Sequence, residues 1–264
     1  MRIGFIGAGN MAQAMIRSMV QGGYAAGTLF VYDVDTEKVQ TLHAELGTGV
    51  AGTYEQVVDA CDAIVIAVKP HVVPTVMEAL GKLSAQKLLI SIAAGWTVEA
   101  LAAIAPQGAR CVRVMPNTPA MVGEGMMAIS LAHQLTAEEA QEVERALACC
   151  GRVAWVEDRL MDAVTAVSGS GPAYAFAFID AMADGGVREG LPRAQAVQLA
   201  AQTVLGAARM VLETGTHPAA LKSNVCSPGG TTIEAVYALE EHSFHFAVMS
   251  AVAAAAAKSR ELGK

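Results

Sequence analysis

The first 156 residues alternate between short, β-branched apolar runs and longer segments with helical spacing. Runs of four to six apolar residues suit strands that are buried on both faces of a parallel sheet. Each helical segment supplies the crossover that two parallel strands require. The alternation therefore predicts an α/β fold with a doubly wound, Rossmann-like parallel sheet over residues 1–158.

The expected strands and helices follow from this pattern. Strands are expected at residues 3–6, 29–32, 63–68, 88–92, 111–115 and 152–156. Helices are expected between them at residues 11–21, 37–46, 72–80, 98–104 and 136–150. Thr136 and Glu139 have the spacing of a capping box, which predicts that the last of these helices starts there.

The strand pattern ends near Asp158, and the rest of the chain is rich in alanine and small residues. Helical segments are expected at residues 161–166, 173–189, 193–215, 231–241 and 244–262. Apolar helices without a covering layer tend to pair with a second subunit. Residues 159–264 are therefore expected to form an all-α domain that joins two copies into a homodimer.

Bulk properties exclude several classes of protein. A net charge of −7 with only 18 Lys and Arg argues against general binding of nucleic acid. The longest bland apolar run, residues 251–257, is far shorter than the ~20 residues of a membrane-spanning helix. Five cysteines without Cys-x-x-Cys spacing indicate neither a disulfide framework nor a metal site. With a glycine turn at Gly7 instead of a signal peptide, these features predict a cytoplasmic protein.

A glycine-rich turn directly after the first expected strand predicts a dinucleotide site. The turn reads Gly7-Ala8-Gly9-Asn10-Met11 and continues into Ala12. Gly7 permits a tight turn, and Gly9 lets the backbone approach a pyrophosphate. Free N–H groups at the start of the following helix suit its anionic oxygens. The expected cofactor is NAD(H) or NADP(H), and an ordinary glycine turn is the alternative.

Asp33 stands at the end of the second expected strand, where a carboxylate accepts hydrogen bonds from the adenosine ribose. Taken alone, it favours NAD over NADP. The alternative is that Asp33 and Asp35 cap the helix that starts near Thr36. No arginine lies between residues 22 and 109, so a 2′-phosphate would depend on Lys38, hydroxyls or backbone groups. The choice between the two cofactors stays open.

Two further segments are expected beside the cofactor because they follow strands at the carboxyl edge of the sheet. They are Ala67-Val68-Lys69-Pro70 and Met115-Pro116-Asn117-Thr118-Pro119. Asn117 and Thr118 are expected to present polar groups toward the nicotinamide end. The alternatives are a solvated Lys69, a Pro70 that only starts a helix, and a rigid structural turn around Asn117.

These motifs, together with two glycine-rich interruptions at residues 168–174 and 227–233, resemble the pyrroline-5-carboxylate reductase family over essentially the whole chain. The resemblance implies reduction of 1-pyrroline-5-carboxylate to L-proline, the last step of proline biosynthesis, with NADPH or NADH. It also implies an interlocked dimer of helical domains, sometimes part of a decamer, with each active site bordered by a neighbouring subunit. The sequence departs from the family at Ser223, where relatives commonly carry Asp, and at Asp33, where NADP-preferring members often carry small or basic residues.

The second glycine-rich interruption is expected to bind the substrate. Gly229, Gly230 and Thr231 place backbone N–H groups at a helix start, where they suit the substrate carboxylate, and Ser227 reinforces the loop. The resemblance implies that Thr232 is the catalytic residue, with its hydroxyl near the ring nitrogen. A helix cap after a proline turn is the alternative.

Two other functions remain as alternatives. A β-hydroxyacid dehydrogenase also joins a Rossmann domain to helices, and Lys222 would then be its candidate catalytic lysine. A non-catalytic nucleotide-sensing protein would keep Gly7 and Gly9 without needing Thr232.

Overall fold

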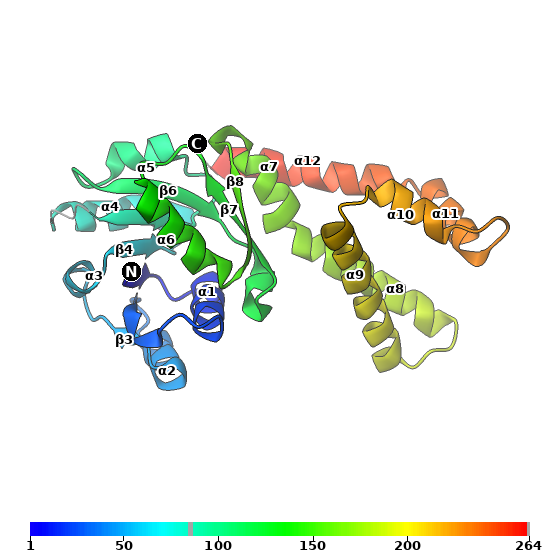
Figure 1. Cartoon of the computed structure of the whole chain (residues 1–264), viewed down its shortest axis with the longest axis horizontal. Coiled ribbons are helices and arrows are strands. Elements are labelled where there is room, and N and C mark those ends of the chain that lie inside the picture. Colours follow the sequence, from blue (N-terminus) through cyan, green and yellow to red (C-terminus); the bar gives the residue numbers. More distant parts are fainter. Residues whose placement is uncertain (84–86, 263–264) are drawn as a thin grey trace. The chain divides into compact units, whose positions relative to one another are not determined.

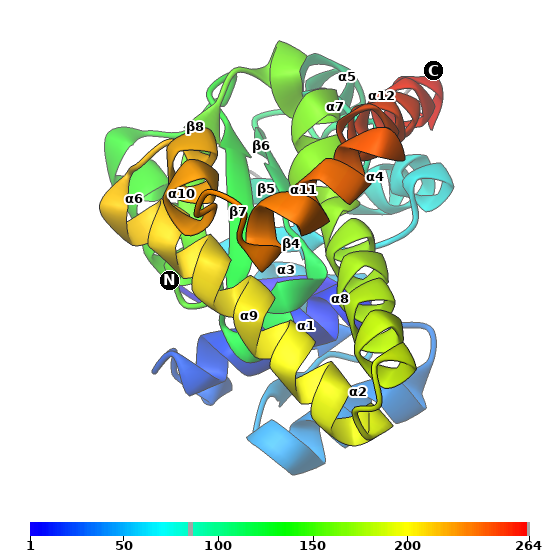
Figure 2. The same cartoon turned by 90° about the vertical axis from the view of Figure 1, so that its right-hand side faces the viewer.

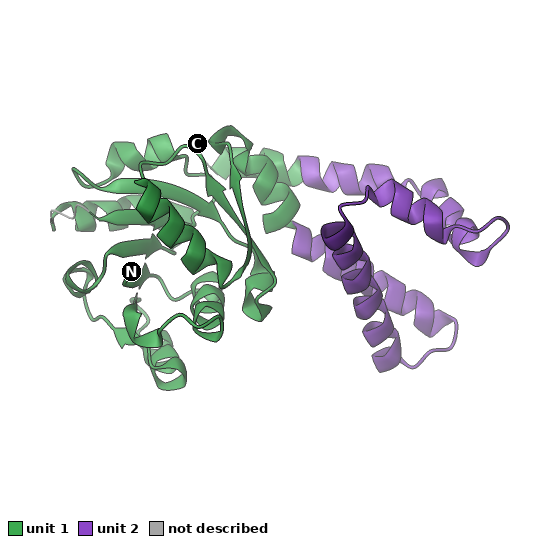
Figure 3. Cartoon of the chain, in the orientation of Figure 1, with its two compact units in different colours: residues 1–170, 254–264 green, residues 171–253 purple. Residues whose placement is uncertain are grey.

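The computed structural model describes residues 1–83 and 87–262 of the chain and divides into two compact units (Figure 3). Unit 1 consists of residues 1–170 together with the segment that starts at residue 254. Unit 2 consists of residues 171–253. The domain boundary expected after residue 158 stays a prediction, and residues 263 and 264 of the expected second domain lie outside the described residues.

The described part of unit 1 is built on an eight-stranded sheet with the order β3-β2-β1-β4-β5-β6-β7-β8 (Figure 1). The strands are β1 (Ile3–Ile6), β2 (Leu29–Tyr32), β3 (Gly49–Val50), β4 (Ala63–Ile66), β5 (Leu88–Ser91), β6 (Arg110–Met115), β7 (Gly125–Ser130) and β8 (Gly151–Val156). Strands β1 to β6 pair in parallel. Their order is that of a doubly wound dinucleotide-binding sheet, which confirms the predicted fold class.

Helices cover both faces of this sheet. They are α1 (Asn10–Gln21), α2 (Thr36–Leu46), α3 (Tyr54–Ala60), α4 (Val73–Gly81), α5 (Val98–Ile104), α6 (Ala137–Ala148) and α7 (Met161–Val164). Short helical turns are η1 (Ala26–Thr28), η2 (Pro70–Val72), η3 (Thr118–Val122), η4 (Asp158–Leu160) and η5 (Thr165–Gly169), of which η5 is π-helical. Phe5 packs in one apolar cluster with residues of α1, α2 and α6, whereas the next residue, Ile6, packs in another with α3, α4 and α5. This alternation explains why the strands are apolar runs with no polar face.

β7 was not among the expected strands, and it runs antiparallel to β6. Only residues 116–124 separate the two strands, which is too short for the crossover that a parallel pair requires. β8 then pairs in parallel with β7 after the crossover through α6. The capping box that starts α6 is formed as predicted, with both the Thr136 and Glu139 side chains bonded to backbone N–H groups.

Unit 2 is helical, as the sequence predicted. It contains α8 (Gly171–Arg188), α9 (Arg193–Thr214), α10 (Pro218–Val225), α11 (Thr231–Glu241) and the first part of α12 (Phe244–Leu262) (Figure 2). Small side chains bring α8 and α9 together, and Ala183, Ala196 and Ala200 are buried there. The helix α10 was not expected. Within the described residues, no helix combines the length and the hydropathy that crossing a bilayer takes.

Many large apolar side chains of unit 2 are exposed in the single chain. Phe176 on α8 is 63% exposed, Tyr237 on α11 is 62% exposed, and Phe246 on α12 is 71% exposed. Exposed aromatic side chains on three helices of one unit indicate a surface that is covered in an assembly.

Candidate active site

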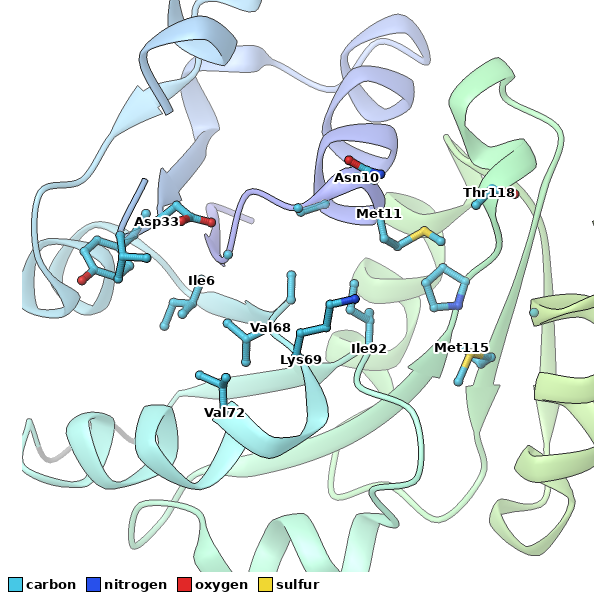
Figure 4. Close-up of a pocket in the computed structure, with 18 of the residues that line it drawn as sticks. Ile6, Asn10, Met11, Asp33, Val68, Lys69, Val72, Ile92, Met115 and Thr118 are labelled. Atoms are coloured by element: carbon cyan, nitrogen blue, oxygen red, sulfur yellow. The ribbon is translucent and has the colours of Figure 1, made fainter. Parts of the chain in front are cut away.

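A cavity of about 810 Å³ lies within unit 1 where β1, β2, β4 and β6 end (Figure 4). Its size is in the range of small-molecule sites. The parallel register places the ends of three strands side by side, because Ile6 of β1 pairs with Tyr32 of β2 and with Ile66 of β4. The residues that follow these strands therefore converge at one edge of the sheet. This is the switch point at which open α/β sheets bind their ligands.

Eight of the predicted cofactor residues line this cavity. They are Gly7, Gly9, Asn10, Met11, Asp33, Ala67, Val68 and Lys69. Three do not line it: Ala8, Pro70 and Asn117. Sequence reasoning did not assign several other residues of the lining, among them Tyr32, Tyr54, Ile92, Thr165, Gly169 and Ser170.

The turn between β1 and α1 can only be made by glycine at its first position. Gly7 has φ of +105°, and a Cβ there would lie 2.5 Å from the carbonyl oxygen of Ala67. Gly9 is different, because an added Cβ would have no neighbour within 4 Å and would project into open space. A glycine at this place keeps the cavity free for a bulky group close to the backbone.

The start of α1 fits a pyrophosphate. Gly9 is its N-cap, no side chain of the described residues caps it, and its first turn has no acidic residue. The first N–H groups of a helix have no partner within the helix and carry a partial positive charge. Gly9, Asn10 and Met11 line the cavity, so this helix start faces the space that the cofactor would fill. The residues present therefore fit a dinucleotide.

Asp33 follows β2 and is fixed by two backbone groups of the loops around it. Its Oδ2 accepts a hydrogen bond from the N–H of Ala8 at 2.6 Å, and its Oδ1 accepts one from the N–H of Asp35 at 2.8 Å. Asp35 is the N-cap of α2, but its side chain does not cap that helix and instead pairs with Lys38 at 2.9 Å. The hydrogen bond from Lys38 lowers the pKa of Asp35. The side chain of Asp35 therefore does not cap α2, whereas Asp33 bonds to the N–H of the residue at its N-cap.

The segment after β4 combines a fixed backbone with a free side chain. Pro70 is the first residue of η2, and its carbonyl oxygen accepts a hydrogen bond from Nε1 of Trp96 at 3.0 Å. Lys69 precedes it and is exposed to solvent. Figure 4 shows the Lys69 side chain extending into the cavity. Among the described residues that line the cavity, Lys69 is the only lysine or arginine.

The side chain of Asn117 is buried and forms hydrogen bonds within the protein. Its side chain is 8% exposed, and its Nδ2 donates to the carbonyl oxygen of Ser168 at 3.0 Å. Its Oδ1 accepts from the N–H of Met126 at 2.8 Å. The structure thus favours the rigid structural turn that was the alternative for this residue. Asn117 affects the cavity only indirectly, through its bond to Ser168 in the π-helical turn. Two other residues of that turn, Thr165 and Gly169, line the cavity wall.

The loop predicted to bind substrate belongs to unit 2 and ends at the start of α11. Gly229 has φ of +69°, and the N–H of Gly230 donates to the carbonyl oxygen of Ser227 at 3.1 Å. Gly230 is the N-cap of α11, and no side chain of the described residues caps this helix. The start of α11, with Thr231 and Thr232 as its first two residues, thus has free N–H groups.

Ser223, where the sequence departs from the family, lies on α10 just before this loop. Its hydroxyl donates to the carbonyl oxygen of Ala219, one turn earlier in the same helix, at 3.0 Å. Lys222 beside it is 4.0 Å from Glu240 of α11.

Comparisons with known proteins agree over both halves of the chain. A family model described as pyrroline-5-carboxylate reductase dimerisation matches residues 158–262, and one described as NADP oxidoreductase, coenzyme F420-dependent, matches residues 2–95. The pyrroline-5-carboxylate reductase of Escherichia coli (strain K12) is 43% identical over 265 residues, covering 100% of this chain and 98% of that protein. The enzyme of Arabidopsis thaliana is 45% identical, covering 100% and 96%.

The chain belongs to the pyrroline-5-carboxylate reductase family.

Solved structures support the same assignment. The crystal structure of Plasmodium falciparum pyrroline carboxylate reductase with NADP bound superimposes with a TM-score of 0.90 at 33% identity, covering 100% of this chain and 98% of that one. The resemblance inferred from the motifs is thereby confirmed, and so is the prediction of a nicotinamide-dependent oxidoreductase that uses NAD(P)H. Membership of this reductase family also displaces the β-hydroxyacid dehydrogenase and the non-catalytic sensor as first choices.

Proposed function

We propose that this chain reduces 1-pyrroline-5-carboxylate to L-proline with a hydride from NADPH or NADH, as the last step of proline biosynthesis. The observation that carries the proposal is the 43% identity, over the whole chain, to a protein named pyrroline-5-carboxylate reductase. The dinucleotide cavity at the carboxyl edge of the sheet agrees with it.

The cofactor-binding residues have distinct roles in this proposal. N–H groups at the start of α1 bind the pyrophosphate, with Gly7 and Gly9 keeping the backbone close to it. Asp33 binds the adenosine ribose, and Ala67, Val68 and Lys69 flank the cofactor along the wall of the cavity. The bound cofactor supplies the hydride.

The substrate is a five-membered cyclic imine that carries a carboxylate. We assign the carboxylate to the loop of Ser227, Gly229 and Gly230 and to the backbone N–H of Thr231, because this helix start offers uncapped donors to an anion. The imine nitrogen is protonated before hydride transfer, so hydride adds to the neighbouring carbon of an iminium and leaves a neutral ring amine. Thr232 orients the ring, because its hydroxyl oxygen accepts a hydrogen bond from the N–H of that iminium. A threonine hydroxyl is a weak acid, and an orienting role does not require Thr232 to give up its proton.

We also propose that the protein is a cytoplasmic homodimer, joined through its helical domain and able to assemble further. The dimerisation family match over residues 158–262 and the exposed aromatic side chains of unit 2 support the dimer. All five cysteines are free thiols, which agrees with a reducing compartment.

Absorbance of NADPH and NADH, followed separately with 1-pyrroline-5-carboxylate, tests the reaction. Turnover on the imine with either cofactor supports the proposal, and no turnover with both rejects it. Oxidation of 3-hydroxyacids in the reverse direction would support the dehydrogenase alternative instead.

Thr232 is tested with a matched pair of variants. We expect Thr232→Ala to lower kcat while the Kd of the cofactor stays unchanged, and Thr232→Ser to keep most of the activity because it retains the hydroxyl. Equal kinetics for the alanine variant and the unaltered protein would remove Thr232 from the mechanism.

A further inference from the structure

We propose that Asp33 makes this chain prefer NADH to NADPH. The inference rests on the proposed reduction and deepens it by naming the cofactor and the residue that selects it. It goes against what the comparisons suggest by name, since one matching family is described as an NADP oxidoreductase and one solved relative holds NADP.

The carboxylate of Asp33 is held in one orientation. Each of its oxygens accepts one backbone hydrogen bond, from Ala8 at 2.6 Å and from Asp35 at 2.8 Å. The side chain lines the cavity and is only partly exposed. Because both bonds come from the backbone, Asp33 cannot swing away to make room for a second anion without losing them.

The remaining acceptor capacity of this carboxylate suits hydroxyl groups. An ionised carboxylate has about four lone-pair sites, and the two backbone bonds use about half of them. The others can accept hydrogen bonds from the 2′- and 3′-hydroxyls of an adenosine ribose. A 2′-phosphate has no proton to offer and brings a second negative charge to the same place.

The positive charges near Asp33 do not offset its negative charge. The segment from residue 33 to residue 38 has three carboxylates and one cation, Lys38. Lys38 lies 2.9 Å from Asp35, and the hydrogen bond to Asp35 raises the pKa of Lys38, with a smaller contribution from the charge of Asp33. One cation is thus shared between two carboxylates. Lys69, the only lysine or arginine among the described residues that line the cavity, lies away from Asp33 beyond Val68 (Figure 4).

The neighbours of Asp33 are otherwise apolar or aromatic. The rings of Tyr32 and Tyr54 lie with their centroids 4.6 Å apart and their planes tilted by 45°, and both line the cavity together with the exposed Val34. These side chains offer contact surface to an adenosine and no positive charge to a phosphate. The adenosine end of the cavity is therefore built for an unphosphorylated ribose.

Binding of NAD⁺ and NADP⁺ without substrate tests the proposal, measured as Kd by calorimetry or by protein fluorescence. For the unaltered protein we expect NAD⁺ to bind at least about tenfold more tightly, which is the size of one close charge repulsion at a partly exposed site. Asp33→Asn keeps an acceptor for Ala8 and removes the charge, so the preference should fall to within about threefold or reverse. Asp33→Ser is the second variant, and thermal unfolding of both checks that they fold.

Glu37→Gln is the control, because it removes an equal charge from the exposed first turn of α2, four residues from Asp33. It should leave the NAD⁺ preference unchanged. Equal or tighter binding of NADP⁺ by the unaltered protein, or an unchanged preference in folded Asp33→Asn, overturns the proposal. The ratio of kcat/KM for NADH and NADPH with 1-pyrroline-5-carboxylate should change in parallel. If neither cofactor supports turnover, the proposed reaction fails, while the Kd values still decide the role of Asp33.

Discussion

Asn117 and Ser168, 51 residues apart in the chain, are joined by a hydrogen bond of 3.0 Å from the side-chain Nδ2 to the main-chain oxygen. The bond ties the turn after β6 to the π-helical turn η5, which contributes Thr165 and Gly169 to the wall of the cavity. The shape of this wall therefore depends on one buried amide.

Asn117→Ala removes both hydrogen bonds of this amide and leaves the oxygen of Ser168 and the N–H of Met126 without their partner. We expect a loss of about 2 kcal/mol in the free energy of unfolding and a higher Kd for the cofactor. Urea unfolding and cofactor titration measure the two effects. Ser168→Ala is the control, because it keeps the main-chain oxygen and removes only the hydroxyl bond to Val164. Equal effects of the two variants would contradict the assignment.

Alanine at Gly7 should lower the stability of the fold, whereas alanine at Gly9 should weaken cofactor binding. Gly7→Ala places a Cβ 2.5 Å from the oxygen of Ala67 at a positive φ, so we expect it to destabilise the fold by more than about 1 kcal/mol. Gly9→Ala meets no atom within 4 Å, so the unfolding free energy should barely change. The Kd for the cofactor should nevertheless rise, because the new methyl group occupies the approach to the pyrophosphate. A stable Gly9→Ala variant with normal cofactor affinity would show that the pyrophosphate lies elsewhere.

Local sequence signals predicted those parts of the fold that local physics decides. The apolar run of β4 is buried on both faces, and the capping box of Thr136 and Glu139 forms within four consecutive residues. The direction of β7 is decided differently, by the length of its connection to β6 and by pairing with that strand. An apolar run such as Gly125–Ser130 does not by itself show which neighbour it pairs with.

The same distinction applies to the candidate site. Gly7, Gly9 and Asp33 line the cavity and could be predicted, because each follows a strand end at a spacing that dinucleotide sites require. Thr165 could not, since its contribution depends on a π-helical turn held by a residue distant in the chain. Gly169 belongs to the glycine-rich motif at residues 168–174, which the sequence singled out without assigning it to the cofactor site. Asn117 does not line the cavity, because its amide finds partners that no local pattern reveals, and its orientation toward the nicotinamide stays a prediction.

The ion pair of Arg110 and Glu139 should make stability depend on pH. Nε of Arg110 lies 3.0 Å from both carboxylate oxygens of Glu139, and the N–H of Thr136 lies 3.0 Å from Oε2. Burial works to raise the pKa of Glu139, but the hydrogen bonds from Arg110 and Thr136 outweigh it and the pKa is lowered. A carboxyl group with a lowered pKa in the folded state stabilises that state above its unfolded pKa of about 4.3. The contribution is lost as the pH falls through the folded value.

Glu139→Gln is therefore expected to cost about 1 kcal/mol of unfolding free energy near neutral pH, and less as the pH is lowered below about 4.3. Urea unfolding at a series of pH values measures this difference. Glu138→Gln, in the same first turn of α6, removes an equal charge at an exposed place and serves as the control. A difference between Glu139→Gln and the unaltered protein that stays constant with pH would show that the ion pair does not contribute.

Arg113 on β6 is 1% exposed and lies between two carboxylates, with Nη1 3.8 Å from Asp158 and Nη2 3.9 Å from Asp162. Burial lowers the pKa of its guanidinium group, and the two carboxylates oppose that effect. The carboxylates are held in turn by hydroxyl donors, Ser130 at 2.8 Å from Asp158 and Ser259 of α12 at 2.6 Å from Asp162. Removing one carboxylate leaves the buried Arg113 cation with a single opposite charge, and a buried charge without a partner destabilises the folded state.

We expect Asp158→Asn to lower the unfolding free energy by about 2 to 3 kcal/mol, since Arg113 is buried, but Asp158 is partly exposed and the distance between them is long. Asn keeps an oxygen for Ser130, so the loss reports on the charge and not on that hydrogen bond. The double variant Arg113→Met with Asp158→Asn should recover part of the loss, because it removes the cation as well. Urea unfolding of Asp158→Asn, of Arg113→Met and of the double variant completes the cycle. Full additivity of the single effects would mean that Arg113 and Asp158 do not interact across the long distance that separates them.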